Sequence, residues 1–150
     1  MKIIAAGTVA AFALLIGMGA ARAEALTEAQ VIYQTTTNDK DGDTAVSAEF
    51  FCDAHTVAID SGHNNEHWDD QSTSSAFEMQ IIEHPSKADL DRCSLRVSAT
   101  ANGNDRWDYN IAVVAFFDDG SRREWVFENG SLNSRDSHTV SQEFPMSNHR

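Results

Sequence analysis

Short stretches in which apolar and polar residues alternate recur along this chain, and they constrain its fold more than any other feature. In Ala45–Cys52, the side chains of Val46, Ala48, Phe50 and Cys52 share one face of an extended strand, because successive strand side chains point to opposite sides. Similar segments, rich in β-branched and aromatic residues, span residues 29–37, 56–59, 76–82, 94–101, 107–117, 122–127 and 139–144. The chain therefore predicts an all-β protein of about eight strands.

The connections between these segments indicate how the strands are arranged. Asp, Asn, Gly and Ser dominate them, and only residues 87–92 have a helical pattern, of a turn or two at most. The sequence FDDGS at residues 117–121 predicts a tight hairpin, because Asp-Gly accepts the positive φ of a type I′ turn, and GND at residues 103–105 predicts a second turn. Such spacing predicts a single antiparallel β-sandwich, with a small closed β-barrel as the alternative.

The beginning of the chain has the features of a secretory signal peptide. Lys2 gives a positive start, residues 3–20 are almost continuously apolar or small, and Ala21-Arg22-Ala23 is an A-x-A cleavage pattern. We expect a cleaved leader over residues 1–23, one domain over residues 24–150, and a periplasmic or extracellular location. A retained membrane helix is the alternative, but no basic stop-transfer flank follows, and no later segment is apolar enough to span a bilayer.

The chain contains two cysteines, Cys52 and Cys93, and both lie in the expected mature domain. In an oxidising compartment the simplest interpretation is one disulfide between them. The alternative is a reactive thiol pair, which is disfavoured because the chain has no C-x-x-C motif.

The charge balance limits the classes of partner. The chain carries 11 Lys and Arg against 23 Asp and Glu, for a net charge of −12. Such a surface repels nucleic-acid phosphates and anionic lipid headgroups. We therefore expect no nucleic-acid partner, and we expect contact with an anionic membrane only where a cation alters the charge locally.

The most acidic connection reads TNDKDGDT, with Asp39, Asp41 and Asp43 at alternate positions. If Gly42 lets the backbone curl, alternate carboxylates converge as they do in calcium-binding loops. Like charges at such spacing repel, and a divalent cation would remove the repulsion. An EF-hand is excluded, because the twelfth position counted from Asp39 holds Phe50 in place of the bidentate glutamate.

Ca²⁺ takes six to eight oxygen ligands, so other connections must complete the site. The predicted set consists of Asn38, Asp39, Asp41, Asp43, Asn104, Asp105 and Asp108. The turn containing Asp118 and Asp119 is a less favoured source of ligands. The simpler alternative is that all of these residues are solvated turn residues, since turns use Asp, Asn and Gly for conformational reasons.

The order of these motifs resembles a family of small secreted β-sandwich proteins. The motifs are a strand, N-D-x-K-D-x-D-T, an alternating strand, G-N-D-x-W and a strand ending in F-x-D-G, and together they span roughly residues 31–127. The chain is similar, more distantly, to the C2 and PLAT/LH2 calcium-dependent sandwiches. That resemblance implies Ca²⁺ at Asp39, Asp41 and Asp43 and a lipid, protein or glycan partner bound by loops at one end. The chain departs from it in lacking a basic groove for phospholipid and an apolar pair at the loop tips.

A second polar connection, SGHNNEHWDD, contains the pattern H-x-x-E-H between His63 and His67. In zinc proteases this pattern lies on a helix, which the neighbouring glycine and asparagines oppose. We therefore expect neither a protease nor a Zn²⁺ site at these two histidines. Trp68 in the same connection predicts either a lid over the core or an exposed surface for a sugar ring or a partner side chain.

These features favour a non-catalytic, secreted calcium-binding module that binds a protein, glycan or lipid partner through loops at one end. The first alternative is a metal-free acidic inhibitor or interaction protein for a basic partner, such as a lysozyme-like enzyme. The second is a small hydrolase. The chain holds no G-x-S-x-G elbow, phosphate-binding loop or dinucleotide fingerprint, so we do not expect an enzyme.

Overall fold

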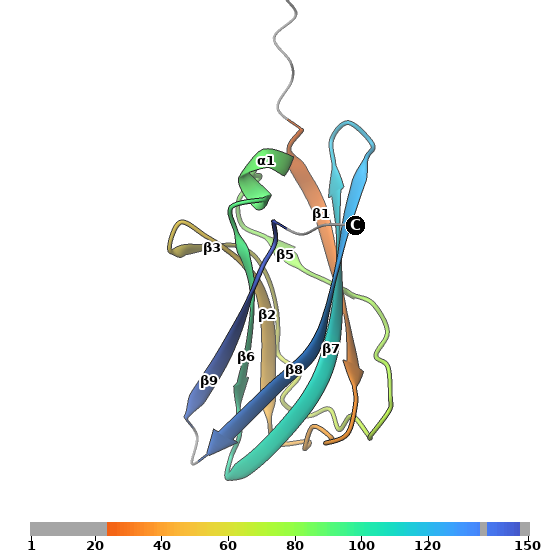
Figure 1. Ribbon diagram of the computed structural model, residues 1–150, viewed down its shortest axis with the longest axis vertical. Coiled ribbons are helices and arrows are strands. Elements are labelled where there is room, and N and C mark those ends of the chain that lie inside the picture. Colours follow the sequence, from red (N-terminus) through yellow and green to blue (C-terminus); the bar gives the residue numbers. More distant parts are fainter. Residues whose placement is uncertain (1–23, 136–137, 148–150) are drawn as a thin grey trace, which may run out of the picture.

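Two antiparallel β-sheets packed face to face form the protein (Figure 1). The computed structural model describes residues 24–135 and 138–147. The four-stranded sheet has the order β4-β1-β7-β8, and the five-stranded sheet has the order β5-β3-β2-β6-β9. The predicted antiparallel β-sandwich is confirmed, and in the described residues it contains nine strands where about eight were expected.

The strands differ widely in length, from two residues in β4 and β5 to 14 in β7 and β8. The strands are β1 (Leu26–Thr35), β2 (Ala45–Cys52), β3 (His55–Ser61), β4 (Phe77–Glu78), β5 (Gln80–Ile81), β6 (Ser94–Thr100), β7 (Asn104–Phe117), β8 (Arg122–Arg135) and β9 (Thr139–Pro145), and the helix is α1 (Lys87–Leu90). The expected signal peptide, residues 1–23, lies outside the described residues. Within residues 24–135 and 138–147, no helix has the length and apolar character needed to cross a membrane.

The alternation that predicted the strands also forms the core. Along β2, every second residue is buried, from Val46 to Cys52, and the residues between them are partly exposed. The four-stranded sheet contributes large aromatic side chains to the same interior. Trp107 and Trp125 are buried, and their indole N–H groups donate to Thr35 Oγ1 at 3.1 Å and Met146 O at 2.7 Å. Both indoles therefore enter the core without leaving a buried donor unpaired.

The segment 76–82, predicted as one strand, is divided between the two sheets. Phe77–Glu78 (β4) pairs with β1, whereas Gln80–Ile81 (β5) pairs with β3. Met79 lies at the crossing with its side chain buried, and its N–H donates to Ala29 O at 2.8 Å. The prediction of one continuous strand was wrong because local alternation does not reveal which sheet a residue pairs with.

The hairpin of β7 and β8 is longer than the sequence predicted. The hairpin at the Asp-Gly sequence is confirmed, but the predicted type I′ turn was wrong, because among these residues only Gly120 has a positive φ, at +82°. The Gly120 N–H donates to Phe117 O at 2.9 Å, so Asp118 and Asp119 are the central residues of the turn. At the other end of β7, the expected turn over residues 103–105 is shifted. Gly103 takes the turn conformation at φ +127°, but Asn104 and Asp105 already belong to β7. These two side chains therefore start from a paired strand and not from a flexible turn.

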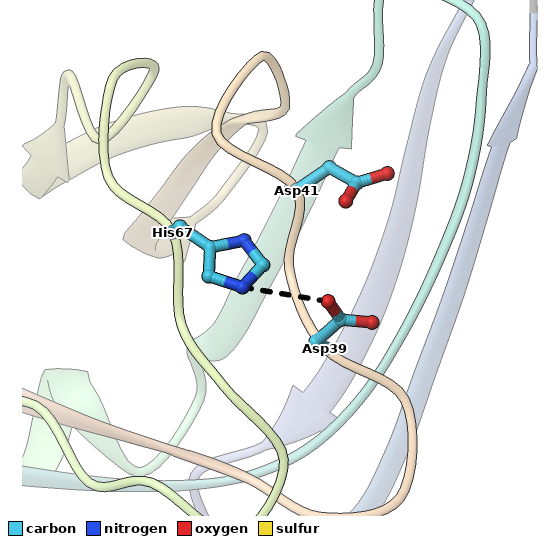
Figure 2. Close-up of side chains that lie close together, drawn as sticks. All are labelled: Asp39, Asp41 and His67. Atoms are coloured by element: carbon cyan, nitrogen blue, oxygen red, sulfur yellow. Dashed lines mark ion pairs between the residues drawn. The ribbon is translucent and has the colours of Figure 1, made fainter.

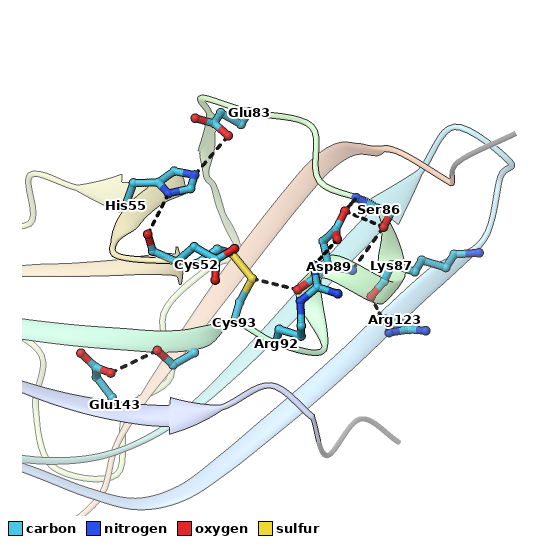
Figure 3. Close-up of a disulfide and its surroundings, with 12 residues drawn as sticks. Cys52, His55, Glu83, Ser86, Lys87, Asp89, Arg92, Cys93, Arg123 and Glu143 are labelled. Carbon is cyan, nitrogen blue, oxygen red and sulfur yellow. Dashed lines mark hydrogen bonds and ion pairs between the residues drawn. A yellow bond between two sulfur atoms is a disulfide. The ribbon is translucent and has the colours of Figure 1, made fainter.

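The predicted disulfide between Cys52 and Cys93 is present. Cys52 ends β2, and Cys93 lies between α1 and β6, so the bond joins the end of β2 to the residue that precedes the neighbouring strand β6, at the end of the sandwich that carries α1 (Figures 1 and 3). Ser86 caps α1 by accepting from the N–H of Asp89. The disulfide and the helix cap thus stabilise the end of the sandwich that carries α1. The opposite end depends on contacts between its loops.

Gly130 on β8 lies against the ring of Tyr109 on β7, and we predict that Gly130→Ala is destabilising. A Cβ at Gly130 would lie 2.4 Å from Tyr109 Cζ. The tyrosine ring cannot easily move, because it stacks on Trp107 with centroids 4.2 Å apart and its hydroxyl donates to Gln142 Oε1 at 3.2 Å. We expect the free energy of unfolding, measured by urea titration, to fall by about 1–3 kcal/mol.

The matched control is Gly42→Ala, because a Cβ at Gly42 would meet nothing within 4 Å. This control should change stability by no more than about 0.5 kcal/mol. Equal effects of the two substitutions would show that the contact between Gly130 and Tyr109 does not limit the packing.

Candidate functional site

A single backbone bridge between two loops organises the end of the sandwich opposite α1. The N–H of Lys40 donates to Trp68 O, and the N–H of Trp68 donates to Lys40 O, both at 3.1 Å. Successive residues of an extended chain point to opposite sides. Lys40 and Trp68 point inward, whereas Asp39, Asp41 and His67 lie on the outer side, where an Asp39 oxygen faces His67 and the Asp41 carboxylate is directed away from the imidazole ring (Figure 2). We call the connections that carry residues 36–44 and 62–70 the loop end.

The inner side of the bridge holds a buried ammonium group. Lys40 is fully buried, and its Nζ donates to the backbone oxygens of Asp41, at 3.1 Å, and of Glu66. The Nζ also lies 5.1 Å from the centroid of the Trp68 ring, which is within reach of a cation–π interaction. Burial lowers the pKa of Lys40, and the surrounding carboxylates, Glu66 and Asp105 first, offset part of that effect. The positive charge of the Lys40 side chain therefore lies on the buried side of the acidic loop.

A chain of polar groups extends from the partly exposed Glu66 to the buried residues His63, Asp60 and Tyr33. The carboxylate of Glu66 lies 3.1 Å from His63 Nδ1 and accepts from the Trp68 indole N–H at 3.1 Å. The other ring nitrogen of His63 lies 2.8 Å from Asp60 Oδ2, which also accepts from the Tyr33 hydroxyl at 2.7 Å. Burial, followed by the charge of Asp60, raises the pKa of Tyr33 well above its usual range.

These contacts explain the H-x-x-E-H pattern. The segment that carries it is not helical, and both ring nitrogens of His63 are already engaged by carboxylates. His63 therefore supports the loop from within and would have to break these contacts to bind a metal together with His67.

The outer side of the bridge gathers three groups that bind metals. One ligand atom from each of Asp39, Asp41 and His67 lies within 4.8 Å of the other two (Figure 2). His67 Nε2 lies 3.6 Å from Asp39 Oδ2 and 3.1 Å from Asp69 Oδ1. Partial burial raises the pKa of Asp41, and the negative charges of Asp105, Asp39 and Asp43 raise it further, whereas His67 lowers it. Repulsion among the acids is thus only partly relieved.

Two of the residues predicted as further ligands lie against the loop but act as hydrogen-bond acceptors. Asp105 Oδ2 accepts from the backbone N–H of Asp41 at 3.3 Å and from the Thr44 hydroxyl. Asp108 accepts from the Asn38 amide and from the Thr37 hydroxyl. Among the described residues, neither Asp105 nor Asp108 joins the group of Asp39, Asp41 and His67.

Asp108 is the most strongly held of these acids. Burial alone would raise the pKa of Asp108, but hydrogen bonds from Ser131, Arg106, Asn38 and Thr37 outweigh burial and hold the pKa below its ordinary value. Arg106 also forms an ion pair with it at 3.1 Å. Asp108 and Asn38 therefore fix the start of the acidic loop to β7, which positions Asp39 one residue further on.

The remaining predicted residues lie apart from the group. Asp43 is exposed and, in the part of the chain that the structure describes, joins no cluster of potential ligands. Asn104 is exposed and lies opposite Arg135 in the pairing of β7 with β8. The less favoured turn lies at the other end of the sandwich, where Asp119 Oδ2 accepts from Lys87 Nζ at 2.8 Å.

His67 and Asp69 were not among the predicted ligands. Both flank Trp68, as Asp39 and Asp41 flank Lys40, so the bridge brings the two pairs to one side. Besides the H-x-x-E-H pattern, which contains His67, the signal in the sequence is this shared spacing around a central residue. This spacing can be interpreted only when the two loops are known to pair.

Trp68 itself forms a lid over the core. Its ring stacks on Tyr33 with centroids 5.0 Å apart and lies 5.5 Å from Trp107. The side chain is partly buried against the core residues. A role for Trp68 in binding a partner stays a prediction.

Neither protein-family models nor curated protein sequences show a match to this chain.

We predict that Lys40→Met weakens the fold at the loop end. Methionine fills similar space but removes the donors to Asp41 O and Glu66 O and the positive charge beneath the acids. The free energy of unfolding should fall by about 2–4 kcal/mol in a urea titration. Lys87→Met is the control, and its loss should be smaller because Lys87 forms ion pairs at the rim, with Glu24 and Asp119. Unchanged or higher stability of Lys40→Met would contradict the role assigned to the ammonium.

We predict that Asp108→Asn changes the acid dependence of stability. A carboxyl whose pKa is lower in the folded than in the unfolded state stabilises the protein above its ordinary pKa of 3.8, and this stabilisation disappears as the pH falls through the folded value. The variant should lose about 1–3 kcal/mol near neutrality. The difference from wild type should shrink in acid, and thermal melts across pH would measure it. A difference that is independent of pH would show that the charge of Asp108 does not contribute.

Proposed function

We propose that this protein is a non-catalytic binding module that acts in the periplasm or outside the cell and holds a divalent cation at its loop end. The observation that carries the proposal is the convergence of Asp39, Asp41 and His67 on the outer side of the bridge. The three come from two loops that are joined by backbone hydrogen bonds and supported by buried side chains. Such a site is positioned before any ion binds, which lowers the cost of binding.

The electrostatics support a cation at this position. The pKa of Asp41 is raised, because of partial burial and then because other acids surround it. Among the described residues, Asp39 and Asp41 form no ion pair with a lysine or arginine side chain, and Asp39 pairs only with His67. The buried Lys40 donates to backbone oxygens and not to these carboxylates. A bound divalent ion would neutralise charge that the protein leaves uncompensated.

In this proposal, an ion at the site would also contact the partner directly. The Asp41 and His67 side chains are exposed, so an ion between them keeps coordination positions toward solvent. Oxygen atoms of a protein, glycan or lipid partner would fill those positions. In this proposal the cation lets a strongly acidic surface bind an oxygen-rich or anionic group that it would otherwise repel.

A second candidate is a metal-free interaction protein for a basic partner, and one observation favours it. The loop end is already held by the Lys40 ammonium and the hydrogen bonds of Asp105 and Asp108, so it does not require an ion to keep its shape. The net charge of −12 would then attract a basic surface directly.

The proposal predicts that a divalent cation raises the melting temperature of the oxidised protein. An ion at 100 times its dissociation constant adds about 2.7 kcal/mol to stability, or roughly 10 °C for a domain of this size. Thermal melts with Ca²⁺, Mn²⁺ and Zn²⁺, each with and without a chelator, would measure it. Asp39→Asn with Asp41→Asn should abolish the shift.

The control removes the same charge elsewhere, through Asp53→Asn with Asp70→Asn, and should keep the shift. If no cation shifts the wild type, the cation proposal fails and the metal-free interaction protein is the function that remains.

A further inference from the structure

We propose that the turn between β6 and β7 is a site of spontaneous covalent modification, at which Asn102 loses its side-chain amide and becomes an aspartyl or isoaspartyl residue. The chain contains two Asn-Gly pairs, Asn102-Gly103 and Asn129-Gly130. The same local sequence therefore occurs in two structural settings, and only the first of them permits the reaction. The modification requires neither a bound ion nor a partner, so it is independent of the function proposed above.

The reaction needs no enzyme and no reactant besides water. The backbone nitrogen of the glycine loses its proton and attacks Cγ of the asparagine. A C–N bond forms, the bond from Cγ to the amide nitrogen breaks, and ammonia leaves. The resulting five-membered succinimide then adds one water molecule. Opening of the ring at Cγ gives an ordinary aspartate, whereas opening at the backbone carbonyl gives isoaspartate, in which the main chain runs through the side chain. Glycine favours the attack, because it has no Cβ to obstruct the ring and the greatest backbone freedom.

The setting of Asn102 leaves room for this attack. Asn102 and Gly103 lie outside the strands, between the end of β6 at Thr100 and the start of β7 at Asn104. Both residues of the pair are exposed. Gly103 has a φ of +127°, and a Cβ built on it would meet nothing within 4 Å. The space beside the Gly103 backbone is therefore open, and closure of the ring interrupts no pairing between strands.

The setting of Asn129 opposes the same attack. This pair lies within β8, where Gly130 is paired with Tyr109 of β7. The N–H of Asn129 donates to Asn110 Oδ1 at 3.0 Å. Gly130 is buried, and a Cβ built on it would lie 2.4 Å from Tyr109 Cζ. The peptide group between the two residues cannot rotate toward the side chain of Asn129 until the local structure opens, and such opening costs free energy.

The product at residue 102 would change the surroundings of the acidic loop, because the turn adjoins the loop end. Asp105, three residues after Asn102, accepts from the backbone N–H of Asp41 at 3.3 Å. On the other side of the turn, the N–H of Ala101 donates to Ser134 Oγ at 2.8 Å. Either product adds a carboxylate to this acidic region. Isoaspartate also lengthens the backbone by one methylene between these two anchored residues.

Peptide mapping by mass spectrometry, after incubation of the oxidised protein at mildly alkaline pH, would test the proposal. In the folded protein we expect Asn102 to react at least about tenfold faster than Asn129, which corresponds to an opening cost of about 1.4 kcal/mol or more at Asn129. In concentrated urea the two rates should become similar, because only the local sequence then matters. Fragmentation by electron transfer would distinguish aspartate from isoaspartate. Asn102→Gln is the control, and it should abolish the reaction at this position while the net charge stays the same.

The effect of the product can be measured on the same samples. Asn102→Asp introduces the charge without lengthening the backbone. Incubated wild type that is rich in isoaspartate should therefore have a lower melting temperature than Asn102→Asp.

Three outcomes would overturn the proposal. The first is that Asn102 stays intact in the folded protein. The second is that Asn102 and Asn129 react equally fast in the folded protein. The third is that their rates differ in urea by the same factor as in the folded protein, which would assign the difference to neighbouring residues and not to the structure.

Discussion

The pairing of Lys40 with Trp68 is the interaction on which the loop end depends. Two hydrogen bonds join connections that are otherwise free of regular structure, and the alternation of an extended chain then separates a buried inner side from an exposed outer side. The inner side satisfies an ammonium with backbone oxygens and an indole ring. The outer side concentrates carboxylates around one imidazole. Both the local support of the loops and the chemistry offered to a ligand follow from this one contact.

Much of the fold could be predicted because it depends on local alternation and turn chemistry. The faces of β2 and the position of the hairpin between β7 and β8 were correct for that reason, although the turn is not of type I′. Segment 76–82 was wrong because its residues pair with different sheets, and long-range pairing leaves no local pattern. The start of β7 was misplaced for a related reason. Asn104 and Asp105 have the composition of a turn, but pairing with β8 extends the strand through them.

The candidate site was predictable only in part. Asp39 and Asp41 were identified because alternate acids within one loop are visible in the sequence. His67 and Asp69 lie in a different connection, and nothing in either segment specifies that the two meet. Lys40 was overlooked for a physical reason, since a lysine between aspartates is normally solvated and its burial depends on carbonyl oxygens supplied by the fold. Asp105 and Asp108 were correctly expected near the loop, where they bind its backbone and side chains.

The register of the bridge has a consequence for how this region can vary. Adding or deleting one residue between Asn38 and Lys40 would reverse which side chains face inward, so that an aspartate would replace the ammonium against the indole. The length of the segment is therefore more tightly restricted than the identity of its individual residues. An insertion of two residues keeps the same side chains buried, whereas an insertion of one residue exposes the side chains that were buried and buries those that were exposed.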